Sequence, residues 1–336
     1  HEREEEIWET FRRVIVGIRK NPVDLLFIAG DLFHRQPLLG QLRQVNEWFA
    51  AIPETRIFLM AGDHGYIKED SFYRKFRWAT NVTFFDTEEQ RCVEIPEKNI
   101  FVSGLSFEHK EVRSPLYDEW KPVNKPGFHV LLAHGGDLSC CPMDFTGLAA
   151  AGFDYVALGH SHKPHTVCRD KIAYSGSLEP LDRNDLGKHG YIQGEYEDGN
   201  VKVRLVPCAN RSYQNLVLNV DRDTTQYKLE EMLRSEVMRR GGRNIYRLIL
   251  KGRVSPDNVL LTERLHGLGN IVEIMDESRP AYNIEELYRQ YRGTLIGDYI
   301  NKFLNKDLTV VEKKALYYGL QALLSTQVLT DDRKRL

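Results

Sequence analysis

The chain has 336 residues, which is enough for one large domain and a smaller one with an ample core. Its 46 lysines and arginines nearly balance its 48 aspartates and glutamates, so any nucleic-acid surface can only be a local patch. We find no apolar run long enough to cross a bilayer, no secretory leader and no C-x-x-C pair among the five cysteines, and therefore expect a reduced, cytoplasmic protein without a membrane contact.

Helices and apolar strands alternate along the first half of the chain. Residues 2–20 have apolar side chains at helical spacing, with acids early and basic residues late, which predicts an amphipathic helix that ends at Asn21-Pro22. Shorter helices are predicted around 41–50 and 144–151. Four continuous apolar runs predict buried strands, and each leads directly into aspartate or histidine among glycines. The runs are VDLLFIAGDLF (23–33), RIFLMAGDHG (56–65), FHVLLAHGGD (128–137) and FDYVALGHSH (153–162).

The second half of the chain predicts a hairpin, a small α/β unit and helices. A turn at 197–200 joins two alternating strands, and residues 213–277 are predicted as strand, helix, strand, helix and strand. Apolar residues at helical spacing from Ile284 to Phe303, and a capping box that opens at Thr309, predict two further helices. We therefore divide the chain into an α/β domain at 1–210, a βαβαβ cap at 211–278, helices at 279–326 and a charged tail at 327–336.

The polar residues at the four strand ends are metal-type ligands. The motifs are GD (30–31), GDHG (62–65), AHGG (133–136) and GHSH (159–162). Aspartate can bridge two cations, imidazole suits Mn, Fe or Zn, and glycine lets backbone and phosphate approach closely. In extended backbone His160 and His162 point to the same side. The motifs together predict one composite two-metal site, although that histidine pair alone would equally fit a strand cap bonded to nearby carbonyls.

These four motifs, in this order, resemble those of the calcineurin-like metallophosphoesterase superfamily. The sequences GDLFHR, YSGSLEPLDRND and KHGY further resemble its SbcD-type branch of DNA-repair exonucleases, close to the YhaO-like bacterial proteins. The resemblance implies a layered αββα sandwich with a small cap and C-terminal helices. It also implies two Mn2+ ions, with Mg2+, Fe or Zn as alternatives, and DNA as the substrate. The partners that the resemblance implies are an SbcC-like ABC/SMC-type ATPase and a second copy of the chain.

The resemblance also implies a role for each motif residue. Asp31 matches the carboxylate that bridges the two metals, and His64 matches the histidine that acts as general acid without being a ligand. The implied metal ligands are Asp31, Asp63, His134, His160 and His162. An activated hydroxide would attack the phosphodiester between the two metals.

Candidate substrate contacts lie near these motifs. By family analogy His34 lies near the phosphate path, although on its own it would equally fit a hydrogen-bonded loop residue. The stretch SFYRKFRW (71–78) interleaves cations with aromatic rings. The candidates for substrate binding are His34, Arg35, Arg74, Lys75 and Arg77. The alternative for this stretch is a short helix that buries Phe72 and Phe76.

The sequence departs from the family pattern in two places. These are the GDHG motif and a missing D-x-H motif. In GDHG, Asp63 stands where the family has asparagine, which adds negative charge and removes an amide donor, and Gly65 stands where the family has an acid. The family's D-x-H motif also does not occur, and we expect it on a strand that precedes His1. The chain as given would then hold one metal tightly and hydrolyse little. The alternatives are a metallophosphoesterase for a small nucleotide or phosphoprotein, and a catalytically degenerate subunit that docks DNA or an ATPase.

Overall fold

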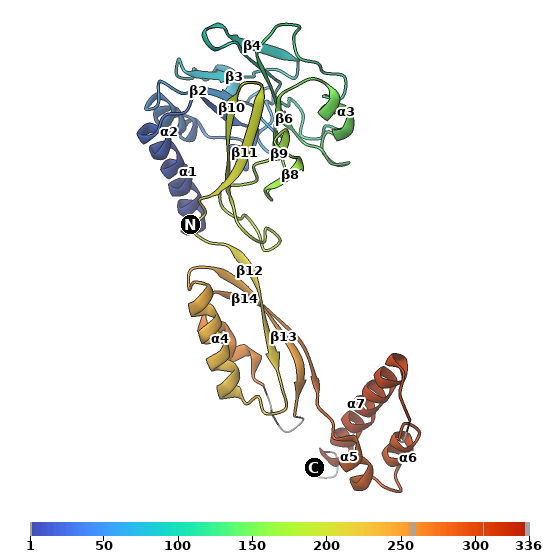
Figure 1. The fold of residues 1–336 in the computed structure, drawn as a ribbon. Helices are drawn as coiled ribbons and strands as arrows, with labels where there is room; N and C mark the ends of the chain where they lie inside the picture. The colour runs from blue at the N-terminus through green and yellow to red at the C-terminus, as the bar shows by residue number, and fades with distance from the viewer. Residues whose placement is uncertain (1, 256–257, 259, 305, 333–336) are drawn as a thin grey trace. The chain divides into compact units, whose positions relative to one another are not determined.

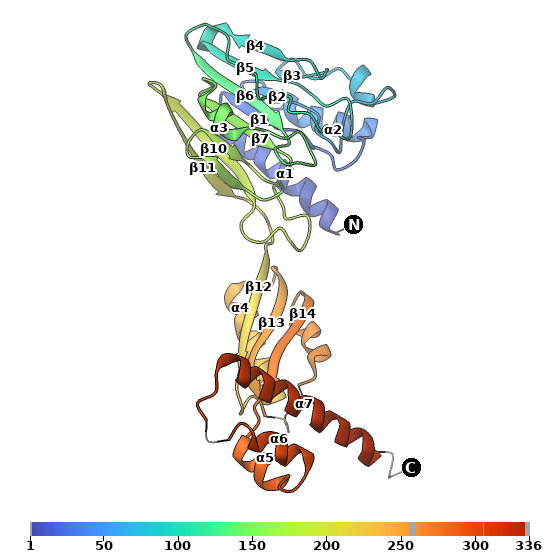
Figure 2. The same ribbon diagram turned by 90° about the vertical axis from the view of Figure 1, so that its right-hand side faces the viewer.

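The computed structural model describes residues 2–255, 258, 260–304 and 306–332, and the chain forms two compact units. The first unit holds the residues up to Asn215 together with Gly241–Tyr246. The second holds Leu216–Arg240 and the residues from Arg247 onward. Figures 1 and 2 show the ribbon from two sides. Within the described part of the chain, no helix is both long and apolar enough to span a membrane.

The predicted helices of the first unit are present. They are α1 (Glu2–Lys20), α2 (Leu39–Ala50) and α3 (Phe145–Ala150). The apolar face of α1 packs on α2 through aromatic rings, with the Trp8 and Trp48 centroids 5.6 Å apart and those of Phe11 and Phe49 6.2 Å apart. Such edge-to-face pairs add to the burial that holds an amphipathic helix in place.

Two sheets form the body of the first unit. The smaller sheet is parallel, with the order β1 (Leu25–Ile28), β2 (Arg56–Leu59) and β3 (Val82–Phe84). The larger is mixed, with the order β4-β5-β6-β7-β9-β8. Its strands are β4 (Arg91–Ile95), β5 (Ile100–Gly104), β6 (Phe128–His134), β7 (Tyr155–Gly159), β8 (His165–Cys168) and β9 (Ile172–Tyr174). The chain is therefore an α/β protein with mixed sheets, and the four predicted strands are β1, β2, β6 and β7.

One buried cluster joins the two sheets. It contains Phe58 of β2, Val102 of β5 and Leu132 of β6, all without solvent exposure. Because these apolar side chains come from interior strands of both sheets, their burial holds the two sheets together in a common core.

The segment 71–78 forms a short helix, but not the one predicted as the alternative to substrate contact, in which Phe72 and Phe76 would be buried. It forms a short 3-10 helix, η1 (Phe72–Lys75), in which Tyr73 is buried and Phe72 is 47% exposed. The expected buried face of Phe72 and Phe76 is therefore wrong, because a 3-10 turn has three residues per turn and turns Tyr73 inward instead. Tyr73 stacks on Phe84 with centroids 5.0 Å apart.

Two connecting elements complete the first unit. A second 3-10 helix, η2 (Pro96–Lys98), links β4 to β5. The predicted hairpin is β10 (Gly190–Glu197) paired antiparallel with β11 (Asn200–Pro207), and the pair forms a two-stranded sheet of its own.

A three-stranded sheet and one long helix form the core of the second unit. The sheet has the order β12-β13-β14, and α4 (Gln226–Arg240) buries Leu229, Leu233 and Val237 at helical spacing. The strands are β12 (Tyr213–Val220), β13 (Ile245–Val254) and β14 (Ile271–Pro280). The second predicted helix, at 256–267, is instead a 3-10 helix, η3 (Thr262–Leu268), and residues 256–257 and 259 lie outside the described part of the chain.

Three helices end the described chain. They are α5 (Ile284–Gln290), α6 (Leu295–Asn301) and α7 (Val310–Asp332). The predicted stripe is thus divided between two short helices, and α6 buries Ile296 and Ile300 rather than Leu295. The capping box is confirmed, since Thr309 N donates to Glu312 at 2.9 Å and Glu312 N to the Thr309 hydroxyl at 3.3 Å. The predicted tail begins within α7, and residues 333–336 lie outside the description.

Candidate metal centre

The four motifs lie where parallel strands end. β1 and β2 run side by side with Ile28 level with Leu59, and β6 and β7 do so with His134 level with Gly159. The residues that follow such strands meet at the carboxyl edge of a sheet, which is the usual place for a ligand site in α/β proteins.

His134 is the buried centre of this group. Its imidazole has no solvent exposure, and Nδ1 donates to the Ala29 carbonyl at 2.7 Å. This bond directs Nε2 toward Asp63 Oδ1 at 2.8 Å and Asp31 Oδ2 at 3.4 Å. Burial by itself would lower the pKa of His134, but the hydrogen bonds to Asp31 and Asp63 outweigh it and raise the pKa to about 9.

Asp63 joins two imidazoles. Its Oδ1 also accepts from His160 Nδ1 at 3.2 Å. Burial would raise the pKa of Asp63, but the hydrogen bonds from His134 and His160 hold it far below its usual range. The bond to Asp63 in turn raises the pKa of His160. Asp63 is therefore an ionised carboxylate with two histidines directed at it.

Asp137 and Cys140 join the site, although sequence reasoning did not select them. Asp137 Oδ2 accepts from His160 Nε2 at 3.0 Å, so each nitrogen of that imidazole faces a carboxylate. Such an outer carboxylate fixes the orientation of a ligand histidine. The Cys140 thiol lies with Asp63, His134 and His160, and the ligand atoms of these four residues are all within 4.8 Å of one another. A carboxylate and a thiol within six residues of His134, in AHGGDLSC, were the available signal.

Close approach of the chain segments depends on glycine. A Cβ on Gly62 would lie 2.5 Å from Asp31 Oδ1, and a Cβ on Gly159 would lie 1.6 Å from the Ala29 carbonyl oxygen. Two of the ligand-type residues themselves have positive φ, 47° for Asp31 and 93° for His160. Non-glycine residues adopt such conformations at a cost, and these are concentrated at functional sites.

His64 and His34 lie beside Asp31, whereas His162 lies beside two other carboxylates. The His64 backbone N donates to Asp31 Oδ1 at 3.0 Å, and the rings of His34 and His64 stack with centroids 4.4 Å apart. Burial, followed by the charges of His64 and His162, lowers the pKa of His34. His162 Nδ1 lies 3.8 Å from Asp185 Oδ2, and its ligand-type group consists of His162, Asp182 and Asp185.

The basic candidates differ in how they are held. Arg74 donates to the carbonyls of Ile67 and Lys68 at 3.1 Å and pairs with Glu108 at 3.2 Å. Its guanidinium therefore braces the 67–75 loop. Arg35, Lys75 and Arg77 are exposed. They stay candidates for substrate contact.

The donor types fit divalent transition metals. Asp31, Asp63, His134 and His160 bring carboxylate oxygen and imidazole nitrogen together from four strand ends, and both ligand types suit Mn, Fe and Zn. A further ligand-type group is formed by Asp31, Asp63 and His64.

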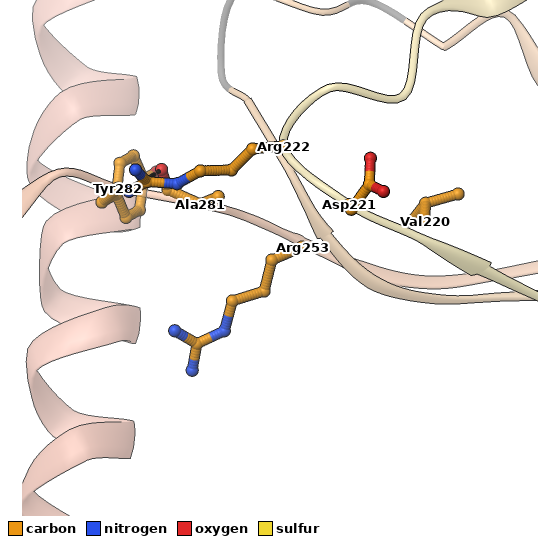
Figure 3. Close-up of a pocket in the computed structure, with 6 residues that line it drawn as sticks. All are labelled: Val220, Asp221, Arg222, Arg253, Ala281 and Tyr282. Atoms are coloured by element: carbon orange, nitrogen blue, oxygen red, sulfur yellow. Dashed lines mark hydrogen bonds between the residues drawn. The ribbon is translucent and has the colours of Figure 1, made fainter. Parts of the chain in front are cut away.

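The second unit contains a pocket of a different kind. It has a volume of about 340 Å3 and is lined by Val220, Asp221, Arg222, Arg253, Ala281 and Tyr282. Figure 3 shows Arg222 extended toward Ala281, whose carbonyl it meets at 3.2 Å. With neither histidine nor cysteine in its lining, this pocket is not a candidate for a transition metal.

Comparison with known proteins agrees with the site. Residues 1–164 match the family described as calcineurin-like phosphoesterase. The chain is 22% identical over 266 residues to the uncharacterized metallophosphoesterase YhaO of Bacillus subtilis, covering 74% of this chain and 64% of the relative. It is 26% identical over 198 residues to the DNA double-strand break repair protein Mre11 of Methanocaldococcus jannaschii (55% and 53% covered), and 25% identical over 229 residues to that of Methanopyrus kandleri (59% and 51%). The chain thus spans between 51% and 64% of the length of these relatives.

Proposed function

We propose that the chain is a metal-dependent phosphodiesterase of SbcD type that acts on DNA, because residues 1–164 match the calcineurin-like phosphoesterase family. The names of the Mre11 relatives, which refer to double-strand break repair, support DNA as the substrate class. The observation on which the proposal depends is the convergence of Asp31, Asp63, His134 and His160 from four strand ends.

Each residue of the site has a part in this proposal. Asp31, Asp63, His134 and His160 would hold one cation, and His162 with Asp31 would contribute to a second. Divalent cations held there, Mn2+ in this proposal, would polarise the phosphodiester and make a water molecule a better nucleophile at neutral pH. His64 protonates the departing sugar oxygen, and His34, stacked on it, limits the orientations that its ring can take.

The other parts of the chain have proposed roles as well. We propose that the two sheets of the first unit are the central layers of an αββα sandwich. The cap at 211–278 would orient DNA through its basic residues, and the helices at 279–326 would dock an ABC/SMC-type ATPase. The exposed Val311 and Tyr318 of α7 give that surface an apolar character suited to a protein partner.

Metal-dependent cleavage tests the proposal. With Mn2+, a protein in which the D-x-H motif precedes this chain is expected to cleave linear duplex or single-stranded oligonucleotides faster than a mononucleotide, and EDTA should abolish cleavage. The 336-residue chain alone should hydrolyse little. Asp31→Asn is the matched negative control, because it keeps the shape of the side chain and removes the charge. Preference for the mononucleotide would favour a small-nucleotide phosphoesterase instead.

A non-catalytic docking subunit is the second candidate. Asp63 favours it, because a carboxylate adds negative charge where the family's asparagine could donate to phosphate. If Asp63→Asn gave cleavage that the native chain lacks, while both bound DNA equally, the docking role would be supported.

A further inference from the structure

Cys140 lies in a buried position that an ordinary core cysteine does not require. It is 4% exposed, and its Sγ is within 4.8 Å of a ligand atom of each of Asp63, His134 and His160. A buried cysteine usually behaves as a small apolar side chain. Cys140 belongs to the apolar core cluster that contains Leu131 and Ala133, but its thiol also lies beside a carboxylate and two imidazoles, groups that an apolar side chain gains nothing by approaching.

The loop around Cys140 holds the thiol in this position. The Cys140 N donates to Asp137 Oδ1 at 2.9 Å, and the Gly136 N donates to the Cys140 carbonyl at 2.9 Å. Gly135 and Gly136 both have positive φ, and a Cβ on Gly135 would come within 2.7 Å of the Cys140 carbonyl oxygen. The same Asp137 bonds His160, so one carboxylate positions both the thiol and an imidazole of the group.

The charges of the four donors match one divalent cation. Asp63 as a carboxylate and Cys140 as a thiolate bring two negative charges, and the two histidines bind as neutral rings. One carboxylate oxygen, one sulfur and two imidazole nitrogens are a donor number and type found in four-coordinate zinc sites. Mn2+, by contrast, favours carboxylate, carbonyl and water ligands over sulfur.

We propose that the first cation is held by Asp63, His134, His160 and Cys140, with Cys140 taking the place given above to Asp31, and that this one position therefore selects Zn2+ over the Mn2+ named above. The inference rests on the metal centre of the proposed function but is independent of any phosphodiesterase activity. This would also explain why Asp63 stands where the family has asparagine, because its carboxylate supplies the second negative charge beside the Cys140 thiolate.

Cobalt substitution tests the proposal without an activity assay. Co2+ added to the metal-free 336-residue chain is expected to give a near-ultraviolet sulfur-to-cobalt charge-transfer band, and excess Zn2+, but not Mn2+, should displace the cobalt. Cys140→Ser should remove the band. It should also weaken Zn2+ binding by more than the roughly 10–100-fold that loss of an outer partner costs. Cys141→Ser is the matched control, because Cys141 is equally buried but outside the ligand group.

A second variant keeps the test decisive if Cys140→Ser does not fold. Replacing Cys92, Cys141, Cys168 and Cys208 by serine leaves Cys140 as the single thiol, and the band should remain. Absence of the band in the native chain, or its persistence in folded Cys140→Ser, would overturn the proposal. Failure of the nuclease assay would leave this result unaffected, so the two conclusions can be separated.

Discussion

At the scale of single residues, a substitution at His64 should separate catalysis from metal binding. Its imidazole stacks on His34, and its Nε2 lies 4.0 Å from Asp63 Oδ2. His64→Ala is expected to keep the metal content of the chain and to lower kcat by about 10^2–10^4-fold, because it removes an acid and not a ligand. Metal analysis beside steady-state kinetics measures both. His109→Ala, an exposed histidine paired with Glu88, is the control, and loss of metal together with activity would refute the assignment.

The pKa of His134 makes metal binding depend on pH. Its folded pKa of about 9 lies above the ordinary 6.5, so protonated His134 stabilises the metal-free fold fully below pH 6.5, and this stabilisation is lost as the pH rises through about 9. A cation must displace that proton. Its apparent affinity should therefore rise at least about tenfold per pH unit up to about pH 9, and more steeply where His160 and the Cys140 thiol also lose a proton on binding. Calorimetry in two buffers of different ionisation enthalpy measures the released proton, and a pH-independent affinity would contradict the prediction.

Sequence reasoning at this scale succeeded where the motif fixes the geometry. His134 ends β6 and His160 directly follows β7, while Asp31 and Asp63 lie within four residues of the ends of β1 and β2, so the meeting of these four residues could be predicted from the strands. Asp137 and Cys140 lie on a loop instead. Their side-chain directions depend on the positive φ of Gly135 and Gly136, and on Tyr174, whose hydroxyl donates to the Gly135 carbonyl at 2.7 Å. No local pattern encodes such contacts.

At the scale of elements, the glycine at the end of β7 controls how closely the strand ends approach. Gly159→Ala would place a Cβ 1.6 Å from the Ala29 carbonyl oxygen, and the backbone there cannot move without shifting His134 or His160. We expect the free energy of unfolding to fall by about 3 kcal/mol or more. Denaturant unfolding measures this loss.

Gly17→Ala is the matched control. Gly17 lies on the exposed face of α1 with no atom within 4 Å of the added Cβ, and this substitution should stabilise the fold by about 0.5–1 kcal/mol. Equal effects at the two glycines would show that the approach of β7 to Ala29 is not tight.

Element types were predictable where the periodicity was long, and not where it was short. The 19-residue α1 has its apolar face on several turns, whereas the four residues of η1 do not complete enough turns to distinguish an α-helix from a 3-10 helix. The hairpin of β10 and β11 was predictable because the turn sequence at 197–200 lies between two runs in which polar and apolar residues alternate.

At the scale of the whole molecule, the boundary between the units was only partly visible in the sequence. The predicted division at 210/211 misses Gly241–Tyr246, which folds with the first unit. There the Ser212 N donates to Asn244 Oδ1 at 2.9 Å, a contact across 32 residues. Pairing at such distances depends on tertiary structure, and a single sequence does not show it.

The basic end of α4 predicts how the second unit acts on DNA. Replacing Arg239 and Arg240, the basic residues in the last turn of α4, with glutamine should weaken duplex binding and lower the slope of log K against log salt by about 2, since each phosphate contact contributes about 1. Hydrolysis of a small chromogenic phosphodiester should not change. Fluorescence anisotropy at several salt concentrations measures the slope. Arg169→Gln, a 94% exposed side chain in the first unit, is the control. An equal loss of activity on DNA and on the small substrate would contradict the proposed role of the cap in orienting DNA.

Because Asp31 and His160 have positive φ angles, the stability of the folded chain should depend on the metal concentration. Each strained backbone costs of order 1–3 kcal/mol, a substantial part of the net stability of a typical domain. A cation that binds only the folded state offsets this cost in proportion to its free concentration. The chain should consequently resist proteolysis when metal is abundant and be degraded sooner in a metal-starved cell, so that its abundance would follow the metal concentration without a dedicated regulator.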